Sequence, residues 1–430
     1  MSSRQTHNNA RATGNFYVAM QQGFGWLVPA NFNMTQVCSQ RWAAQPDAAQ
    51  RTAIIEHHTA GAHHSYSFAQ LQNAADDLSL RLQAMGVQKD DRVAIVLPQR
   101  FETAVAYIAV MQMGAVAMPL SQLFGPEALA YRLHDSEAVA VFVDAASLPG
   151  VLAVRDQAPA LRHVIGLGSG ASAADQSLPD LHAMDAPAFE LCSTQAQDPA
   201  ILIYTSGTTG KPKGALGSHR NLLTNGLSSA YSGAATALRR GDALPEPSIR
   251  ASLLVIPMFH VTACSASMMP TIQAGHKIVL LHKWDTVKAF EIIEREKINA
   301  TGGVPFIAWQ LIEHPDRAKH DLSSIDAISY GGAPSAPELV SKIYEIFGAF
   351  PGNGWGMTET MATVTSHVAE DYLNRPDSCG PAVAVSDLKI MSEDGATELP
   401  IGEVGELWAR GPQIVKGYWN RPDATADTFV

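Results

Sequence analysis

The sequence lacks several features that would place it in particular classes of protein. It contains no Cys-x-x-Cys pair, and its four cysteines lie far apart, at Cys38, Cys192, Cys264 and Cys379. We therefore expect neither a disulfide framework nor a structural zinc site, and we expect a reducing compartment. The longest apolar stretches, such as residues 103–111, are far shorter than the roughly 20 residues that cross a bilayer. We expect no integral membrane segment and a cytoplasmic protein.

Basic residues are also scarce. The 30 Lys and Arg residues against 41 Asp and Glu residues give a net charge of −11 at pH 7, and no basic cluster is visible. This charge repels phosphate backbones, so we expect no nucleic acid partner. Residues 1–13 are polar and lack the apolar run of a signal peptide, and we expect them to form a flexible arm.

What is present is the composition of a globular protein, with 46% hydrophobic and 17% charged residues. A chain of 430 residues is expected to form two or three packed units. Helix-like and strand-like segments alternate from about Tyr66, which predicts parallel sheets covered by helices. The predicted helices are residues 68–85, 103–113 and 126–136. The predicted strands are residues 92–97, 115–120, 138–143, 200–204, 251–256, 277–281 and 325–329.

Two segments interrupt this alternation. Residues 166–177 are rich in Gly, Ser, Ala and Asp, and we expect them to cross between two sheets. From about Gly380 the pattern changes to short strands at residues 386–391 and 405–409, separated by turns. A small β-rich unit is expected there.

The most informative segment is Tyr-Thr-Ser-Gly-Thr-Thr-Gly-Lys-Pro-Lys-Gly at residues 204–214, which follows a predicted strand. Glycines free the backbone to turn its N–H groups toward an anion, while hydroxyls add donors and lysines add charge. A phosphate-binding loop is favoured over a merely solvated loop. It is not a Walker loop, because only two residues separate Gly207 from Gly210 and Pro212 follows the lysine.

A second segment, Asn-Gly-Trp-Gly-Met-Thr-Glu at residues 353–359, combines an aromatic ring with a hydroxyl and a carboxylate. The ring could lie on a flat base, and the polar groups could hold phosphate and Mg²⁺. Taken alone, Trp355 is more often a core residue than a ligand contact, and Glu359 more often a solvated charge at a helix start. A third segment, Tyr-Gly-Gly-Ala-Pro at residues 330–334, follows a predicted strand, where open α/β sheets bind ligands, although a plain turn is an equal alternative.

These segments, in this order, resemble those of the adenylate-forming superfamily, which comprises acyl- and aryl-CoA synthetases, luciferases and peptide-synthetase adenylation domains. The resemblance also includes Pro-Met-Phe-His at residues 257–260, Gly-Pro at 380–381, and the segments 402–407, 410–412 and 417–419. Residues 28–33 and 123–133 look most like the acetyl and medium-chain acyl-CoA synthetase branch.

The resemblance implies two reactions. A carboxylate attacks the α-phosphorus of Mg·ATP to give an acyl-adenylate and pyrophosphate, and the thiol of coenzyme A then displaces AMP. The implied catalytic residues are Lys213, His260, Thr358 and Glu359, with Glu359 also the Mg²⁺ ligand and His260 between the ATP site and the acyl pocket. The implied ATP-binding residues are Thr205, Ser206, Gly207, Thr208, Thr209, Gly210, Gly332, Ala333, Pro334, Asn353, Trp355, Gly356 and Met357.

The resemblance also implies the fold class: α/β, with two helix-covered, mostly parallel sheets packed together and a small β-barrel-like subdomain. We expect a first α/β subdomain at residues 14–190, a second with the ATP and acyl sites at 191–379, and the β-rich subdomain at 380–430. The sequence contains neither the Thr-Gly-Asp nor the C-terminal lid domain of full-length relatives. This predicts the N-terminal domain alone, impaired in the thioester step.

The nature of the substrate is predicted more coarsely. Peptide-synthetase domains usually place Asp where His260 stands, which favours a simple carboxylic acid over an amino acid. Acetate-specific relatives resemble one another in a second Trp at the position of Gly356, so the glycine predicts a deeper pocket and a medium-chain or aromatic acid, unless His260, Phe306 or Trp309 fills the space. The alternatives are a non-catalytic nucleotide- or acyl-binding protein and an adenylation domain serving a carrier protein. A homodimer is compatible with the sequence.

Overall fold

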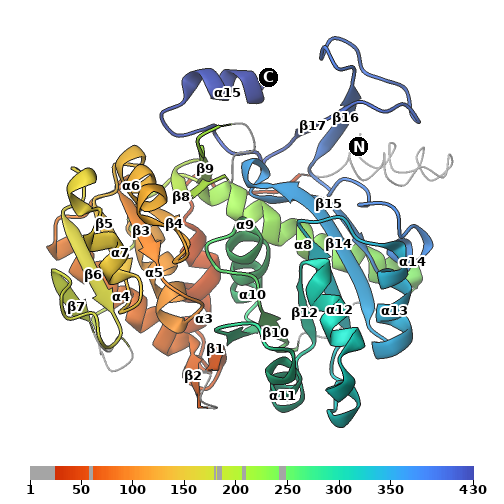
Figure 1. The fold of residues 1–430 in the computed structure, drawn as a ribbon, viewed down its shortest axis with the longest axis horizontal. Coiled ribbons are helices and arrows are strands. Elements are labelled where there is room, and N and C mark those ends of the chain that lie inside the picture. The colour runs from red at the N-terminus through yellow and green to blue at the C-terminus, as the bar shows by residue number, and fades with distance from the viewer. Residues whose placement is uncertain (1–24, 58–61, 179–180, 182–185, 206–209, 242–247) are drawn as a thin grey trace.

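The structure is a computed structural model that describes residues 25–57, 62–178, 181, 186–205, 210–241 and 248–430. Two large sheets lie side by side, and the long helix α8 (His219–Arg240) runs from one to the other (Figure 1). The strand pair β16 (Asp387–Met391) and β17 (Glu406–Arg410) and the helix α15 (Pro422–Thr428) lie above them in this view. The predicted α/β class with two mostly parallel sheets is confirmed.

The first sheet has the strand order β7-β6-β5-β3-β4-β8-β9 among the described residues. All neighbours are parallel except β8 and β9, which form an antiparallel edge. Its strands are β3 (Arg92–Val96), β4 (Val116–Pro119), β5 (Ala140–Val143), β6 (His163–Leu167), β7 (Gln176–Leu178), β8 (Pro199–Tyr204) and β9 (Gly214–Ser218).

The second sheet has the order β15-β14-β13-β12-β10-β11-β1-β2, with antiparallel pairs only at its two edges among the described residues. Its strands are β1 (Thr52–His57), β2 (His63–Ser67), β10 (Ala251–Leu254), β11 (Lys277–Leu281), β12 (Ala300–Gly303), β13 (Ala327–Gly331), β14 (Phe350–Met357) and β15 (Ala362–Val368).

The remaining α-helices cover the sheets or lie between them. They are α3 (Arg41–Ala43), α4 (Phe68–Ala84), α5 (Phe101–Gln112), α6 (Pro126–Asp135), α7 (Leu148–Leu152), α9 (Val261–Ala263), α10 (Met269–Gln273), α11 (Thr286–Glu296), α12 (Pro305–Glu313), α13 (Pro337–Phe347) and α14 (Ala369–Asn374). None of the helices in the described residues is both long and apolar enough to span a bilayer.

Helix α5 is the centre of the core. Every one of its residues is buried, and its apolar side chains belong to the hydrophobic cluster that includes strands of both sheets. A helix that is apolar all round is stable only inside a protein, which explains the long apolar run in the sequence. The Tyr107 hydroxyl donates to the carbonyl oxygen of Met258 at 2.7 Å. The buried helix therefore fixes the loop after β10, which carries His260.

The expected crossing at residues 166–177 is wrong. This segment connects β6 to β7 within the first sheet. The carboxylate of Asp175 holds it there, because it accepts from the backbone N–H of Val164 at 2.8 Å and pairs with Arg155 at 2.7 Å. The later crossing runs through α8, which follows β9 and leads to β10. Because β1 and β2 lie in the second sheet and β8 in the first, the expected subdomain boundary at residue 190 does not follow the sheets.

The β-rich segment contains one two-stranded antiparallel sheet, formed by β16 (Asp387–Met391) and β17 (Glu406–Arg410). The two predicted strands are confirmed, and they form an open ribbon rather than a closed barrel. The chain then returns to the first sheet. Gly417 and Trp419 exchange backbone hydrogen bonds with Leu216 and Gly214 of β9, at 3.0 and 2.8 Å. This return brings the end of the chain against the predicted phosphate loop.

Helix α8 starts at His219, whose ring is completely buried. Its Nδ1 accepts the backbone N–H of Met34 at 3.1 Å, and burial lowers the pKa of the imidazole to about 4. Unfolding restores a pKa of about 6.5, so between these values the unfolded chain binds more protons than the folded one. The contribution of His219 to the free energy of unfolding is therefore complete above about pH 6.5, and it is lost as the pH drops toward 4.

We predict that His219→Asn, which keeps an acceptor near Nδ1 but cannot titrate, makes the free energy of unfolding less dependent on pH. Between pH 7 and pH 5 the variant should lose about 2 kcal/mol less stability than the parent chain, measured by urea unfolding. Exposed His134→Asn is the control and should retain the parental pH dependence. Equal pH dependence in His219→Asn and the parent would contradict the prediction.

Candidate active site

Most of the predicted site residues follow parallel strands of the second sheet. Strands β10, β12, β13 and β14 are parallel neighbours in that order, so their carboxyl ends share one edge. His260 follows β10, the Gly332–Pro334 turn follows β13, and Thr358 and Glu359 follow β14. Such an edge is where open α/β sheets bind ligands.

The predicted phosphate loop connects β8 to β9 at the edge of the first sheet. Its two ends meet, because the backbone N–H of Thr205 donates to the carbonyl oxygen of Lys213 at 2.9 Å and the Thr205 hydroxyl accepts from the Lys213 N–H at 3.3 Å. Gly210 is exposed. The predicted ligands Ser206, Gly207, Thr208 and Thr209 lie outside the described residues.

The flank of this loop is held by a polar cluster. The Tyr131 hydroxyl donates to the carbonyl oxygen of Pro212 at 2.8 Å. The carboxylate of Asp135 accepts from the Tyr204 hydroxyl at 2.8 Å and pairs with Arg421 at 2.5 Å. Because Arg421 comes from the end of the chain, this cluster ties residues far apart in sequence to both sides of the loop.

Lys213 and Glu359 converge on Tyr418, a residue for which the sequence predicts no role. The Tyr418 hydroxyl donates to Glu359 Oε1 at 2.6 Å, and the Lys213 ammonium lies 4.4 Å from the centre of the Tyr418 ring. Burial and the Glu359 carboxylate raise the pKa of Tyr418 far above its usual value, so the hydroxyl stays protonated and able to donate. The buried Tyr418 side chain thus contacts a cation beside the first sheet through its ring and a carboxylate beside the second sheet through its hydroxyl.

The turn that carries Glu359 has an unusual backbone. Met361 and Ala362 follow the short 3₁₀ helix η5 (Thr358–Thr360) with φ angles of +46° and +97°, values that side chains disfavour. Two side chains hold the turn, since Ser265 Oγ donates to the Met361 carbonyl oxygen at 2.7 Å and Asn225 Oδ1 accepts the Thr363 N–H at 3.0 Å. The surrounding structure therefore fixes the position of Thr358 and Glu359.

His260 is the N-cap of helix α9, and its Nδ1 accepts the backbone N–H of Thr262 at 3.2 Å. The residue is exposed, but enough protein surrounds the imidazole that the loss of hydration lowers its pKa below the usual value. The ring is therefore neutral at pH 7 and accepts a hydrogen bond through Nδ1. Helix α9 leads to Ser265, so His260 lies on the same framework as the Glu359 turn.

The predicted adenine-binding segments lie on neighbouring strands. Gly332 has a φ of +74°, with no atom of the described part of the chain within 4 Å of the place where a Cβ would be, and both Ala333 and Pro334 are exposed. Asn353 in β14 pairs with Tyr330 of β13. Trp355 is half-buried, and its backbone N–H donates to Thr365 Oγ1 at 3.3 Å. The side chain of Met357 is 40% exposed at the end of β14.

The expectation that Gly356 leaves an empty pocket floor is wrong. A Cβ on Gly356 would lie 1.5 Å from the carbonyl oxygen of Ala362, at an irregularity in the β14–β15 pairing. The space in the Cβ direction of this glycine is filled by the backbone of the strained turn at Ala362. The glycine is needed for this close approach, so a larger side chain would fit here only if the Ala362 turn moved.

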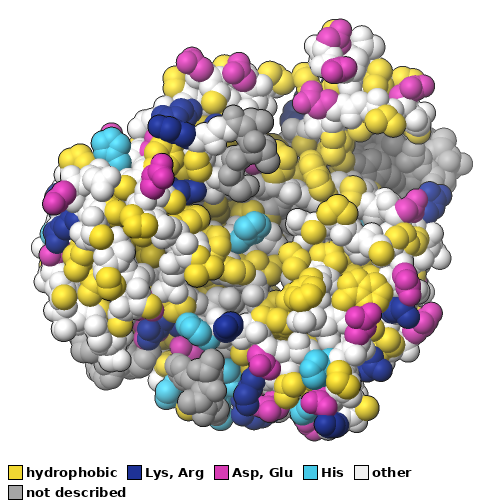
Figure 2. Space-filling model, in the orientation of Figure 1, with side chains coloured by type: hydrophobic (Ala, Val, Ile, Leu, Met, Phe, Trp, Pro, Cys, Tyr) yellow, Lys and Arg dark blue, Asp and Glu magenta, His cyan; other side chains and the backbone are white. Residues whose placement is uncertain are grey.

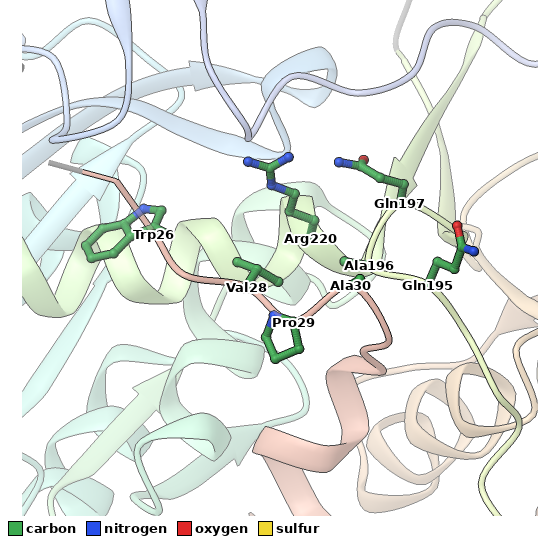
Figure 3. A pocket seen from close by; sticks show the side chains of 8 residues that line it. All are labelled: Trp26, Val28, Pro29, Ala30, Gln195, Ala196, Gln197 and Arg220. Atoms are coloured by element: carbon green, nitrogen blue, oxygen red, sulfur yellow. The ribbon is translucent and has the colours of Figure 1, made fainter.

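A cavity of about 270 Å³ lies elsewhere, between residues 26–30, residues 195–197 and the start of α8 (Figure 3). The Arg220 and Gln197 side chains extend on the same side of this cavity. None of the predicted site residues that the structure describes lines it. The cavity beside Arg220 is therefore separate from the strand edge that carries the candidate site.

The face seen in Figure 2 has hydrophobic side chains gathered in a hollow between the two sheets.

Comparison with known proteins places this geometry in a family. Residues 39–419 match the family model described as "AMP-binding enzyme". The chain is 31% identical over 390 residues to 4-coumarate–CoA ligase 5 of Oryza sativa subsp. japonica, covering 89% of this chain and 69% of that protein. The chain belongs to the AMP-binding, adenylate-forming family.

Solved structures share its fold. A putative long-chain-fatty-acid CoA ligase from Rhodopseudomonas palustris superposes with a TM-score of 0.80 at 26% identity, covering 93% of each chain. ATP-bound MatB from Rhodopseudomonas palustris superposes with a TM-score of 0.77 at 27% identity, covering 92% of this chain and 74% of that one. These three relatives are named for coumarate, for long-chain fatty acids and as MatB, so the expected acetyl and medium-chain branch stays a prediction.

We predict that Gly356→Ala lowers the free energy of unfolding by about 3 kcal/mol, because the added methyl group must displace the Ala362 backbone. Urea unfolding measures the change. Gly210→Ala is the matched control, since none of the atoms that the structure describes lies within 4 Å of its Cβ position, and it should stay within about 0.5 kcal/mol of the parent. If Gly356→Ala were as stable as Gly210→Ala, the close approach would not be a constraint.

Proposed function

We propose that the chain is an AMP-forming acid–thiol ligase. It activates a carboxylic acid with ATP to give an acyl-adenylate and pyrophosphate, and the acyl group is then transferred to the thiol of coenzyme A. The observation that carries the proposal is the convergence of Lys213 and Glu359 on Tyr418, which joins the phosphate loop to the end of β14. The rice relative is named as a CoA ligase, which supports CoA as the acceptor in preference to a carrier protein.

The two ends of the site would divide the triphosphate between them. Thr205, Ser206, Gly207, Thr208, Thr209 and Gly210 would supply loop donors to the outer phosphates, with the charge of Lys213 beside them. Thr358 would donate to the α-phosphate. The similarity of the chain to MatB, whose structure was solved with ATP bound, supports ATP as the nucleotide.

Glu359 fits a Mg²⁺ ion that is shared with the phosphates. Among the residues that the structure describes, no three His, Cys, Asp or Glu side chains form a metal site of their own. Mg²⁺ commonly binds one or two carboxylates together with substrate phosphates and waters, so a single carboxylate suffices. When bound, the ion would neutralise the charge that develops on the phosphates during the reaction.

The adenine would lie at the ends of β13 and β14. The exposed turn Gly332-Ala333-Pro334 would border the base on one side, and Trp355 would contact its face. Asn353, Gly356 and Met357 would complete this wall of the site. Because none of the described residues has an atom within 4 Å of the Cβ position of Gly332, the turn leaves space for a flat ring.

The acid is proposed to be apolar, either medium-chain or aromatic. The strand edge near His260 exposes Val304, Phe306 and Met357, whose exposed fractions are 44%, 60% and 40%. Lys and Arg do not occur in the edge segments 255–260, 303–306, 331–335 and 355–359, all of which the structure describes. These four segments therefore offer no Lys or Arg to pair with a second carboxylate, which supports an acid with an apolar chain.

We predict that Glu359→Gln and Lys213→Ala each weaken the binding of Mg·ATP at least tenfold without a comparable loss of stability. Glu359→Gln removes the charge that holds the metal, and Lys213→Ala removes a charge beside the phosphates. Calorimetric titration and thermal unfolding measure the two effects. Lys319→Ala, an exposed lysine paired with Asp316 in the same helical turn, is the control and should bind Mg·ATP normally. Unchanged affinity in both site variants would refute the site assignment.

The activity itself is tested by acid-dependent release of pyrophosphate from Mg·ATP, with octanoate, benzoate and malonate compared. We expect release with octanoate or benzoate at least tenfold above that with malonate, and mass spectrometry should detect the acyl-adenylate. Mg·ATP binding without release for any acid would favour a non-catalytic binding protein. A preference for malonate would contradict the proposed apolar acid.

A further inference from the structure

Among the described residues, Tyr418 is the aromatic side chain that contacts both charged residues of the proposed site. It is 7% exposed, and its backbone forms an antiparallel bridge with Ala215 of β9. Its backbone N–H also donates to Thr425 Oγ1 at 2.9 Å. The backbone of Tyr418 is therefore held by the first sheet and by helix α15.

We propose that Tyr418 is a positioning residue that holds the Glu359 carboxylate and the Lys213 ammonium in the geometry needed for Mg·ATP. This inference rests on the proposed function and adds to it a residue that would touch neither metal nor nucleotide. The 2.6 Å hydrogen bond from the Tyr418 hydroxyl occupies Glu359 Oε1 and leaves Oε2 for a metal. The carboxylate would then bind the ion through one oxygen, in one rotamer.

The backbone of the same segment reinforces this role. The N–H of Val415 donates to the backbone carbonyl oxygen of Glu359 at 2.9 Å, so residues 415–418 hold both the main chain and the side chain of Glu359. Carboxylates that bind metals are generally oriented by such outer hydrogen bonds, whose removal typically costs 10–100-fold in metal affinity or activity. Tyr418 has the donor, the distance and the rigidity of such an outer partner.

The ring contributes separately from the hydroxyl. The Lys213 ammonium lies 4.4 Å from the ring centre, a distance at which a cation is attracted to the π face. Lysine side chains lose much conformational freedom when they bind an anion, so a preformed contact lowers that cost. Tyr418→Phe removes the hydroxyl and keeps the ring, whereas Tyr418→Leu removes both.

The test measures by calorimetry the dissociation constants of Mg·ATP and of Mg-free ATP for the 430-residue chain. EDTA keeps the second ligand free of Mg²⁺. Tyr418→Phe should raise the dissociation constant for Mg·ATP by 10–100-fold and leave that for Mg-free ATP within about twofold of the parent. Tyr418→Leu should additionally weaken Mg-free ATP several-fold through Lys213. The matched control is Tyr372→Phe, whose buried hydroxyl lies 3.0 Å from that of Tyr330, and it should bind both forms normally.

A double-mutant cycle separates the inference from the proposed function. If Tyr418 acts through Glu359, Tyr418→Phe combined with Glu359→Gln should bind Mg·ATP no more weakly than Glu359→Gln alone. Normal Mg·ATP binding by Tyr418→Phe, while Glu359→Gln is weakened, overturns the positioning role and leaves the proposed function intact. Normal binding by Glu359→Gln overturns the site assignment itself.

A purely structural tyrosine would behave differently. Tyr418→Phe would then weaken Mg·ATP and Mg-free ATP equally, in step with a lower unfolding midpoint, and that result overturns the inference. Should Tyr418→Phe fail to fold, Glu359→Asp replaces it, since this shorter carboxylate keeps its charge but no longer reaches the Tyr418 hydroxyl. It should show the same selective loss of Mg·ATP affinity, and parental affinity would contradict the proposal.

Discussion

The pairing of residues 416–419 with the edge strand β9 is the interaction on which the arrangement of the site depends. Gly417 and Trp419 hydrogen bond to β9, so Tyr418 lies beside the end of the phosphate loop. The same stretch reaches the turn after β14 through Val415 and Tyr418. Residues 415–419, which belong to no strand of either sheet, therefore contact both Lys213 beside the first sheet and Glu359 beside the second.

Strain in the second sheet supports the same site. Met361 and Ala362 have positive φ values, and the Ala362 carbonyl oxygen fills the space beside Gly356. Asn225 and Ser265 hold this turn from α8 and from the helical segment that begins at His260. A glycine that the sequence connects with substrate size instead allows a close backbone approach. The evidence for an apolar acid now comes from the uncharged, exposed edge near His260.

The sequence predicts the elements whose signals are local. Short apolar runs between turns correctly predict β3 and β11, because a strand that is buried on both faces is apolar throughout. Helical spacing predicts α4, because a helix buried on one face repeats its apolar residues every three or four positions. Strands β12 and β14 have no such signal. They contain Thr-Gly-Gly and Pro-Gly-Asn-Gly, and a Cβ at Gly302 would lie 1.7 Å from the carbonyl oxygen of Ser329. Here close approach of neighbouring strands, which is a tertiary constraint, selects the residues.

The site could be predicted only as separate segments. Spacing and residue type single out the phosphate loop and Glu359, but no sequence pattern shows that Tyr418 joins them across more than 200 residues of chain to Lys213. Alternation likewise gives no indication of which sheet a strand enters, which is why the crossing predicted at residues 166–177 is wrong. Contacts of this kind depend on the assembled sheets.

The most direct test of the proposed site is a crystal structure of the chain with a non-hydrolysable ATP analogue and Mn²⁺, located by its anomalous scattering. We predict Mn²⁺ bound to Glu359, with the triphosphate between it and Lys213 and the Tyr418 hydroxyl still on the carboxylate. Nucleotide and metal bound away from Glu359, for example in the cavity beside Arg220, would contradict the proposed site.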